Sequence, residues 1–347
     1  MSIIDSTLYR EQLSLIAEEI PKVDATILVT GATGMIGSCL VDALLYADVH
    51  FGNHLRVIAL GRSTDKLLRR FAYESDTDRL RLAAQDICEP LSIDEPIDYI
   101  LHAASNADPV SYALYPAETL LTNLVGTKNV LDYCKDHPKT RLLFTSTFEV
   151  YGRINEKADG YRETDSGEID LNAIRSCYPE SKRCAEILMR CYQKEYNVDF
   201  VIARLCSIYG PTMAESDSKA HAQFLRNGLE GQDIVLKSKG LQKRTYCYLL
   251  DTVKGIFFTL FRGKSGEAYN ISYEKSVASI AEVAETVACI CGTKVVYDLP
   301  SAIESQGFSR PQDCVLNNDK LKELGWTGSY TLEEGLRSTI AIIRQSK

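Results

Sequence analysis

Short apolar segments alternate with longer segments of helical periodicity from Thr26 to about Tyr209, and no other feature constrains the fold as strongly. The apolar segments are continuous runs, which is typical of strands covered by helices on both faces. They lie at residues 27–30, 56–60, 99–102, 141–146 and 200–204. Helical spacing falls between them, at residues 36–45, 120–134 and 178–196. The alternation predicts a doubly wound α/β fold built on a parallel sheet.

A glycine-rich turn, TGATGMIG at residues 30–37, joins the first strand directly to the first helix. Glycines here let the backbone approach a pyrophosphate, and the helix start offers free N–H groups and the positive end of its dipole. The turn therefore predicts a Rossmann-like site for a nicotinamide dinucleotide. We expect six of its residues to bind the cofactor: Gly31, Thr33, Gly34, Met35, Ile36 and Gly37.

The residues after the second and third strands bear on which dinucleotide binds. An acidic residue after the second strand would accept hydrogen bonds from the ribose hydroxyls of NAD, but Arg62 stands there. Arg62 could stack on adenine or meet the 2′-phosphate of NADP, so we expect NAD and leave NADP open. Asp86 and Ile87 follow the third strand, where they would reach the adenine.

Small residues follow the fourth strand, at the edge of a parallel sheet where ligands bind. The segment His102, Ala103 and Ala104 would let the backbone pass close to the cofactor. We also expect Asn123, in the next helix, to contribute to this site.

A catalytic group is predicted from residues near the next strand and helix. Thr147 closes the apolar run that begins at residue 141. Tyr178 and Lys182 are four residues apart at the start of a helix and therefore share a face. A lysine ammonium beside a phenol, with a cationic nicotinamide nearby, favours the phenolate and lowers the pKa of the tyrosine. Such a tyrosine can take the proton of a sugar hydroxyl held by Thr147 while the cofactor oxidises the carbon.

The bulk composition limits the partners of this chain. A net charge of −8 argues against non-specific binding of nucleic acid, which needs basic surfaces. No apolar run approaches the roughly 20 residues of a membrane-spanning helix, and the first ten residues do not resemble a secretory signal. The 11 cysteines are scattered, and Cys289 and Cys291 have no second pair, so we expect reduced thiols, no metal site and a cytoplasmic protein.

The rhythm of the sequence changes after Tyr209, where Gly210-Pro211 breaks the chain. Helical patterns follow around residues 221–229, 276–291 and 331–343, and we expect them to form a smaller, mostly helical substrate-binding region. We expect an N-terminal helical extension at 1–24 and a dinucleotide-binding domain at 25–209, with a return segment at about 243–272. The substrate-binding region would then comprise residues 210–242 and 273–347.

Several of these motifs together resemble the NAD-dependent epimerase/dehydratase family, a group of extended short-chain dehydrogenases/reductases. The likeness covers roughly residues 25 to 340. Beyond the glycine turn, Thr147, Tyr178 and Lys182, it rests on Arg204, on YGP at residues 209–211 and on LGW at 324–326. The resemblance implies an enzyme that binds a nucleotide sugar, oxidises C4 of the hexose and then epimerises, dehydrates or decarboxylates it. It also implies a homodimer formed through the helices at 120–134 and 178–196.

The residues beside Thr147 bear on which reaction follows. Glu149 resembles the glutamate of the sugar-nucleotide 4,6-dehydratases and UDP-glucuronate decarboxylases, where a carboxylate near C5 can act as a base beside the C4 ketone. Phe148 stands where the dehydratases have an aspartic acid, and a phenyl ring cannot donate a proton. The segment 175–183 resembles the decarboxylases more closely, although Ser207 and Thr212 replace their usual Asn and Arg. We therefore rank decarboxylation first, and dehydration and epimerisation remain open.

The resemblance also implies which residues bind the substrate. Arg244 resembles the arginine that holds the nucleotide diphosphate, for which a bidentate guanidinium is suited. The remaining substrate-binding candidates are Ser105, Tyr112, Ser207 and Arg310. Two other functions stay open: a simple NADP-linked reductase and a non-catalytic dinucleotide-binding protein.

Overall fold

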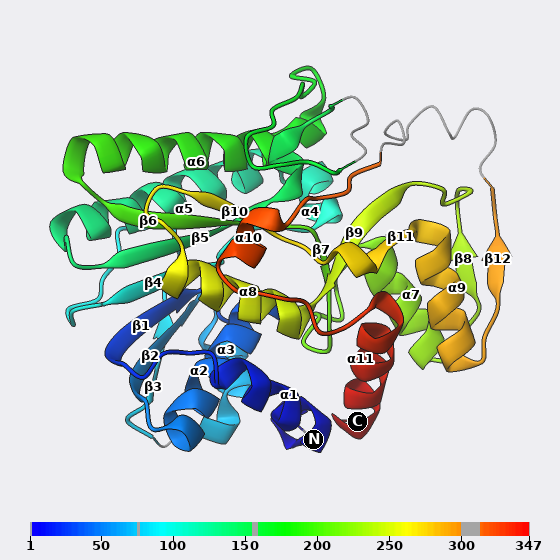
Figure 1. Cartoon of the computed structure of the whole chain (residues 1–347), viewed down its shortest axis with the longest axis horizontal. Helices are drawn as coiled ribbons and strands as arrows, with labels where there is room; N and C mark the ends of the chain where they lie inside the picture. Colours follow the sequence, from blue (N-terminus) through cyan, green and yellow to red (C-terminus); the bar gives the residue numbers. More distant parts are fainter. Residues whose placement is uncertain (1, 75–76, 155–158, 300–312, 347) are drawn as a thin grey trace.

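A parallel sheet of seven strands forms the centre of the computed structural model, which describes residues 2–74, 77–154, 159–299 and 313–346 (Figure 1). The strand order across the sheet is β3-β2-β1-β4-β5-β6-β10. The strands are β1 (Asp24–Thr30), β2 (His54–Gly61), β3 (Leu80–Ala84), β4 (Tyr99–His102), β5 (Arg141–Thr147), β6 (Asp199–Leu205) and β10 (Ala268–Ile271). The doubly wound α/β fold predicted from the apolar runs is confirmed, and each of the five predicted runs lies within a strand.

Helices cover both faces of the sheet, and the pleat of the strands divides their side chains between two cores. In β1, Ile27 and Val29 pack in the core with α2 (Met35–Phe51) and α8 (Leu249–Arg262). Leu28, which points to the other face, packs in the core with α5 (Pro116–Asp136) and α6 (Cys177–Tyr196). Successive residues of a strand point to opposite faces, so a doubly covered strand must be apolar throughout.

Helix α1 (Thr7–Ala17) precedes the first strand and packs against α2, α8 and the last helix, α11 (Leu332–Ser346). Its apolar face is buried, including Leu13 and Ile16. The hydroxyl of Tyr9 donates a 2.7 Å hydrogen bond to the buried carboxylate of Asp42 on α2. The N-terminal segment is thus a packing element of the α2 side of the sheet.

The second part of the chain contains short sheets as well as helices. One sheet comprises β7 (Ser207–Tyr209), β9 (Lys243–Tyr248) and β11 (Val277–Ser279), and the other β8 (Ile234–Leu236) and β12 (Val295–Tyr297). Helices α7 (Ala220–Leu229) and α9 (Ile280–Cys291) pack against them, whereas α10 (Asp319–Glu323) packs against β10 and α8. Within the expected return segment, β10 is an edge strand of the main sheet and α8 packs on that sheet. Strand β9 belongs to the three-stranded sheet.

The predicted helix at 276–291 begins later than expected, at Ile280. Ser279 caps it: the Ser279 hydroxyl accepts a hydrogen bond from Glu282 N, and the Glu282 carboxylate accepts one of 2.6 Å from Ser279 N. This reciprocal cap fixes the start of the helix and leaves the preceding residues free to pair as β11.

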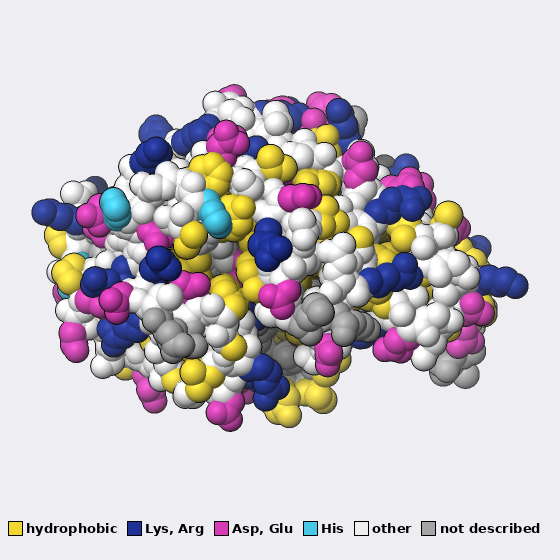
Figure 2. All heavy atoms as spheres, turned by 90° about the horizontal axis from the view of Figure 1, so that it is seen from below, with side chains coloured by type: hydrophobic (Ala, Val, Ile, Leu, Met, Phe, Trp, Pro, Cys, Tyr) yellow, Lys and Arg dark blue, Asp and Glu magenta, His cyan; other side chains and the backbone are white. Residues whose placement is uncertain are grey.

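The surface seen from below carries Lys/Arg and Asp/Glu side chains interspersed with apolar ones (Figure 2). Positive and negative groups alternate on this face and do not gather into a basic area. Within the described ranges, every helix is too short or too polar to cross a membrane.

Candidate active site

The glycine turn brings three backbone segments closer together than side chains would permit. Gly31 has φ +68°, and a Cβ there would lie 2.8 Å from the carbonyl oxygen of Ala103. A Cβ on Gly37 would lie 2.3 Å from the carbonyl oxygen of Gly31. Helix α2 begins at Met35 directly after Gly34, so the N–H groups of its first turn have no partners within the helix. This cradle fits the pyrophosphate of a dinucleotide.

A cavity of about 190 Å³ opens at this turn. Its lining includes eight residues singled out from the sequence: Gly31, Thr33, Gly34, Arg62, Ile87, Ala103, Ala104 and Ser105. It also includes residues that no motif indicated: Leu60, Gly61, Gln85, Asn106 and Thr122. Gln85 directly follows β3, so the rule that ligands bind at the carboxyl ends of parallel strands could have found it.

Of the other expected cofactor residues, Met35, Ile36, Gly37 and Asp86 are not part of the lining of this cavity, whereas Arg62 is. Met35, Ile36 and Gly37 form the first turn of α2. The carboxylate of Asp86 accepts a 2.9 Å hydrogen bond from Cys88 N and so shapes its own loop. The exposed guanidinium of Arg62 pairs with Glu118 at 3.3 Å.

His102 lies buried under the glycine turn and joins neighbouring elements. Its Nδ1 lies 2.8 Å from Thr30 Oγ1, and its Nε2 lies 3.2 Å from Thr127 Oγ1 on α5. Thr30 Oγ1 in turn accepts a 3.2 Å hydrogen bond from Ala104 N. Burial, followed by the charge of Lys182, lowers the pKa of His102 to about 3, so the imidazole is neutral. It orders the backbone that lines the cofactor cavity.

Asn123 connects the cavity to the helix that carries the predicted catalytic pair. Its side-chain oxygen accepts a 2.7 Å hydrogen bond from Ser105 Oγ, and its amide donates one of 2.9 Å to Ser181 Oγ. Ser181 Oγ donates to the carbonyl oxygen of Tyr178 at 2.7 Å. This chain of contacts fixes the first turn of α6 relative to the cavity.

Tyr178 and Lys182 lie buried on one face of α6, as their spacing predicts. Lys182 Nζ donates a 2.9 Å hydrogen bond to the carbonyl oxygen of Thr145 and lies 4.4 Å from the centre of the Phe144 ring. Burial lowers the pKa of Lys182 to about 7.

The environment of the Tyr178 phenol differs from the sequence expectation. Its ring stacks on Tyr112 of α4 (Pro109–Leu114), with 4.6 Å between centroids and 18° between planes. Burial, then the charge of Glu149, raises the pKa of Tyr178, and the hydroxyls of Thr147 and Tyr112 offset this in part. The expected lowering of this pKa is thus not found in the chain itself, because burial disfavours the charged phenolate.

Glu149 and Phe148 line a second, larger cavity of about 570 Å³. Arg175 and Arg244 are also part of its wall. The guanidinium of Arg175 donates two hydrogen bonds, of 2.7 and 3.0 Å, to the two oxygens of the Glu149 carboxylate. Arg175 was not singled out as a functional residue from the sequence, since nothing in its spacing connects it to a carboxylate 26 residues earlier.

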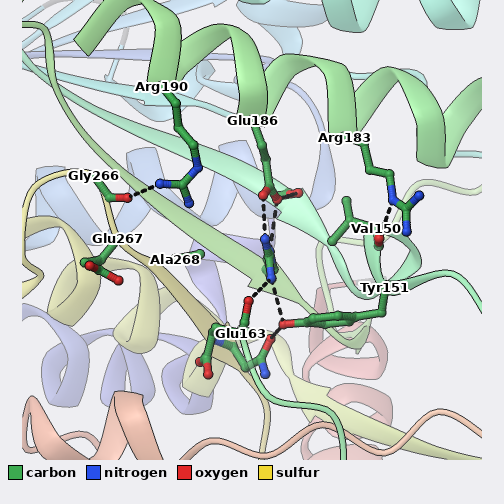
Figure 3. A network of polar contacts seen from close by, with 12 residues as sticks. Val150, Tyr151, Glu163, Arg183, Glu186, Arg190, Gly266, Glu267 and Ala268 are labelled. Atoms are coloured by element: carbon green, nitrogen blue, oxygen red, sulfur yellow. Dashed lines mark hydrogen bonds and ion pairs between the residues drawn. The ribbon is translucent and has the colours of Figure 1, made fainter. Parts of the chain in front are cut away.

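The segment that carries Glu149 is held by polar side chains of α6 and β6 (Figure 3). Arg183 Nε donates a 2.6 Å hydrogen bond to the carbonyl oxygen of Val150. Glu186 pairs with Arg204 at 2.7 Å, and Arg204 donates to the Tyr151 hydroxyl at 3.2 Å. The two residues that follow Glu149 are therefore fixed to the sheet and to α6.

The other expected substrate residues are placed differently. Arg244, on β9, lies 6.0 Å from the Phe148 ring centre, and its buried Nε has no hydrogen-bond partner among the described residues. Ser207 lies in β7 and belongs to the lining of neither cavity. Thr212 Oγ1 donates a 2.7 Å hydrogen bond to the carbonyl oxygen of Met35, in the first turn of α2. Arg310 lies outside the described residues.

In the part of the chain that the structure describes, no three His, Cys, Asp or Glu side chains are grouped so as to hold a metal ion.

The chain is similar to known proteins over most of its length. The model of the NAD dependent epimerase/dehydratase family matches residues 27–272. UDP-glucuronic acid decarboxylase 6 of Arabidopsis thaliana is 33% identical over 321 residues, which cover 89% of this chain and 86% of that protein. Among solved structures, DesIV, a dTDP-glucose 4,6-dehydratase from Streptomyces venezuelae with NAD and TYD bound, is 26% identical, with a TM-score of 0.79 and coverage of 92% and 97%. UDP-glucuronic acid 4-epimerase from Bacillus cereus, in complex with UDP-glucuronic acid and NAD, is 25% identical, with a TM-score of 0.76 and coverage of 92% and 99%.

Proposed function

Because this chain belongs to the NAD-dependent epimerase/dehydratase family, we propose that it is an NAD-dependent enzyme that oxidises C4 of a nucleotide-linked uronic acid and then decarboxylates the sugar. The observation that carries this proposal is the buried face of α6, where Tyr178 and Lys182 stand beside Thr147 at the end of β5. The identity to UDP-glucuronic acid decarboxylases over most of both chains favours decarboxylation as the net reaction.

The cofactor would be held by the glycine cradle and by the residues that line the smaller cavity. The backbone of Gly31 and Gly34 and the first turn of α2 would bind the pyrophosphate. When bound, the nicotinamide would supply the reversible two-electron chemistry that oxidation of a sugar carbon needs. The neutral, buried His102 and Thr30 would keep the Ala103–Ala104 backbone close to the ring without adding a charge beside it.

The side chains around Tyr178 would divide the proton transfers between two steps. Tyr178 would take the proton of the C4 hydroxyl, and Thr147 would hold that hydroxyl in reach. Once C4 is a ketone, a bond at the neighbouring C5 is activated, so a C5 carboxylate can leave as carbon dioxide. Glu149, in the wall of the larger cavity, would then govern protonation at C5. The hydride taken from C4 would finally return to the C4 ketone, so that the sugar loses only carbon dioxide and no cofactor is consumed. Phe148 beside Glu149 offers no proton for expelling a C6 hydroxyl, which disfavours dehydration.

The test is to incubate the protein and NAD with a panel of nucleotide sugars and weigh the products. We expect a nucleotide-linked uronic acid to lose the mass of carbon dioxide. Loss of water would identify a dehydratase, and an unchanged mass with altered retention an epimerase. Net consumption of added cofactor would instead identify a simple reductase, and no turnover of any sugar would contradict the proposal.

Tyr178→Phe provides the matched variant for the first step. The ring and its stacking on Tyr112 are retained, so cofactor binding should persist while C4 oxidation is lost. Full turnover by this variant would remove Tyr178 from the mechanism. Glu149→Gln should leave cofactor reduction intact and stop the later step.

We further propose a cytoplasmic homodimer formed through α5 and α6. Exposed apolar side chains on these helices, Leu121 (52% exposed) and Ile187 (60% exposed), support this contact. We also propose that residues 25–209 with most of 243–272 form the dinucleotide-binding domain and that the remainder after 209 binds the sugar nucleotide.

A further inference from the structure

Arg175 stands where two groups of the proposed site meet. It lies in the short 3-10 helix Ile174–Ser176, immediately before α6. Both of its terminal nitrogens bond to the Glu149 carboxylate, whose side chain is 18% exposed, while the Arg175 side chain is 51% exposed. Two parallel hydrogen bonds from one guanidinium hold a carboxylate in a single orientation, so the contact fixes the direction of the Glu149 side chain.

The same guanidinium reaches the aromatic pair that contains the proposed base. Its central carbon lies 5.7 Å from the centre of the Tyr112 ring, and Tyr112 stacks on Tyr178. The Glu149 charge raises the pKa of Tyr178, and the Arg175 charge lowers it. The two members of the ion pair therefore shift the pKa of the Tyr178 phenol in opposite directions.

The proposed reaction uses two acid–base groups so close together that their charges interact. A phenolate at Tyr178 and a carboxylate at Glu149 repel each other, and a like charge within about 4–6 Å can shift a pKa by about 1–3 units. A guanidinium stays charged at any pH at which the protein folds, and its planar fork matches both oxygens of one carboxylate. Arg175 is therefore able to cancel the charge of Glu149 and to fix its orientation together.

We propose that Arg175 is a positioning residue that neutralises and orients Glu149, so that Tyr178 can lose its proton in the first step while the Glu149 carboxyl group keeps the orientation needed for protonation at C5 in the second. This inference rests on the proposed function. Arg175 acts on Tyr178 through Glu149, and contact with the substrate is not part of the role.

Other titratable groups face Tyr178 from the elements packed against it. Tyr112 comes from α4, and Lys182 and Cys177 come from α6. Glu149 comes from the 3-10 helix Phe148–Tyr151, and Arg175 from the 3-10 helix Ile174–Ser176. Lys182 bonds to Thr145, and His102 behind it is neutral. Among these groups, Glu149 is the anion that Arg175 pairs with.

The test measures the first step alone, as the pH dependence of the rate at which bound cofactor is reduced in a single turnover with a nucleotide-linked uronic acid. Arg175→Met should move the midpoint of this profile upward by about one pH unit or more, the size expected for an uncompensated neighbouring charge. Arg175→Lys, which keeps the charge and loses the fork, should restore most of the shift. The affinity for uridine diphosphate, measured by calorimetry, should stay within about twofold, about 0.4 kcal/mol.

The double variant Arg175→Met/Glu149→Gln decides the route of the effect and covers the case in which the single variant folds poorly. Its profile should match that of Glu149→Gln alone, because no charge is left to neutralise. A shift of the same size in the Glu149→Gln background would overturn the proposal, and so would an unshifted profile in Arg175→Met. Failure of the proposed function would look different, since the wild-type protein would then reduce no cofactor with any sugar of the panel.

Discussion

Lys182 Nζ donates a 2.9 Å hydrogen bond to the carbonyl oxygen of Thr145 inside the protein, where the Lys182 side chain is 2% exposed. The bond ties α6 to β5 directly beneath Tyr178. The Lys182 amine is therefore held in a buried environment that disfavours its charged form, which makes the stability of the protein depend on pH.

We predict that Lys182 makes the stability of the protein depend on alkaline pH. Burial lowers the pKa of Lys182 to about 7, well below its ordinary value, so the unfolded chain binds more protons above neutrality. The contribution of Lys182 to the free energy of unfolding should therefore rise as the pH increases from about 7 to 10, by about 1.4 kcal/mol for each unit of pKa difference, and the comparison with a variant that lacks this lysine isolates it. Denaturant unfolding of wild type and Lys182→Met at both pH values measures this. The gain should be absent from Lys182→Met and present in Lys128→Met, whose lysine is exposed; parallel pH curves for wild type and Lys182→Met would contradict the prediction.

We predict that His102 makes the stability of the protein depend on pH in the acid range. The pKa of His102, about 3, lies below the ordinary value of an imidazole. The contribution of His102 to the free energy of unfolding is therefore complete above about pH 6.5 and is lost as the pH falls toward 3. His102→Gln cannot titrate and should show a flatter acid profile in thermal unfolding. At neutral pH it should cost about 1–3 kcal/mol, because Thr30 and Thr127 lose a buried partner. His54→Gln, at an exposed position, is the control and should keep the wild-type slope.

Gly37→Ala should weaken dinucleotide binding. The added methyl group would meet the carbonyl oxygen of Gly31 at 2.3 Å, and backbone on both sides has to shift to relieve the clash. We expect the Kd for NAD to rise about tenfold or more, which is about 1.4 kcal/mol. Gly52→Ala is the control, because a Cβ on Gly52 has nothing within 4 Å, and its positive φ (+69°) strains the backbone only locally, at the end of α2. It should lose a little stability and bind NAD normally; equal losses of affinity in both variants would show that the clash is not the cause.

The buried pair of Glu186 and Arg204 should be more important for folding than for binding. Their side chains are 6% and 12% exposed, and Glu186 also accepts a 2.6 Å hydrogen bond from Ser146. Glu186→Leu leaves the guanidinium without its counter-ion and should cost about 3–5 kcal/mol of unfolding free energy. Glu186→Leu/Arg204→Met should lose clearly less than the sum of the single variants in denaturant unfolding. Additive losses would mean that the two side chains do not act as a pair.

Much of the site could be predicted from short stretches of sequence. The glycine turn could be recognised because a strand, a turn and a helix follow one another within residues 24–51. Tyr178 and Lys182 could be placed on one face because helical spacing alone determines this. Residues just after strands could be expected at one edge of the sheet, and eight of the expected residues do line the smaller cavity.

Other features depend on where distant segments meet. Arg175 pairs with Glu149 across 26 residues of sequence. Tyr112 of α4 stacks on Tyr178 of α6, and no periodicity predicts a contact between these two helices. Strand β9 begins the expected return segment at about 243–272, but it pairs with β7 and β11 and not with the main sheet, because strand pairing depends on contacts between segments distant in the sequence.

The sequence by itself determined the order of strands and helices, the phosphate cradle and the shared face of Tyr178 and Lys182, because each depends on residues close together in the chain. Only the tertiary structure decided the partner of Glu149, the neutral state of His102 and the direction in which the pKa of Tyr178 moves. Those properties depend on burial and on the distances between charges from different elements, and a linear pattern specifies neither.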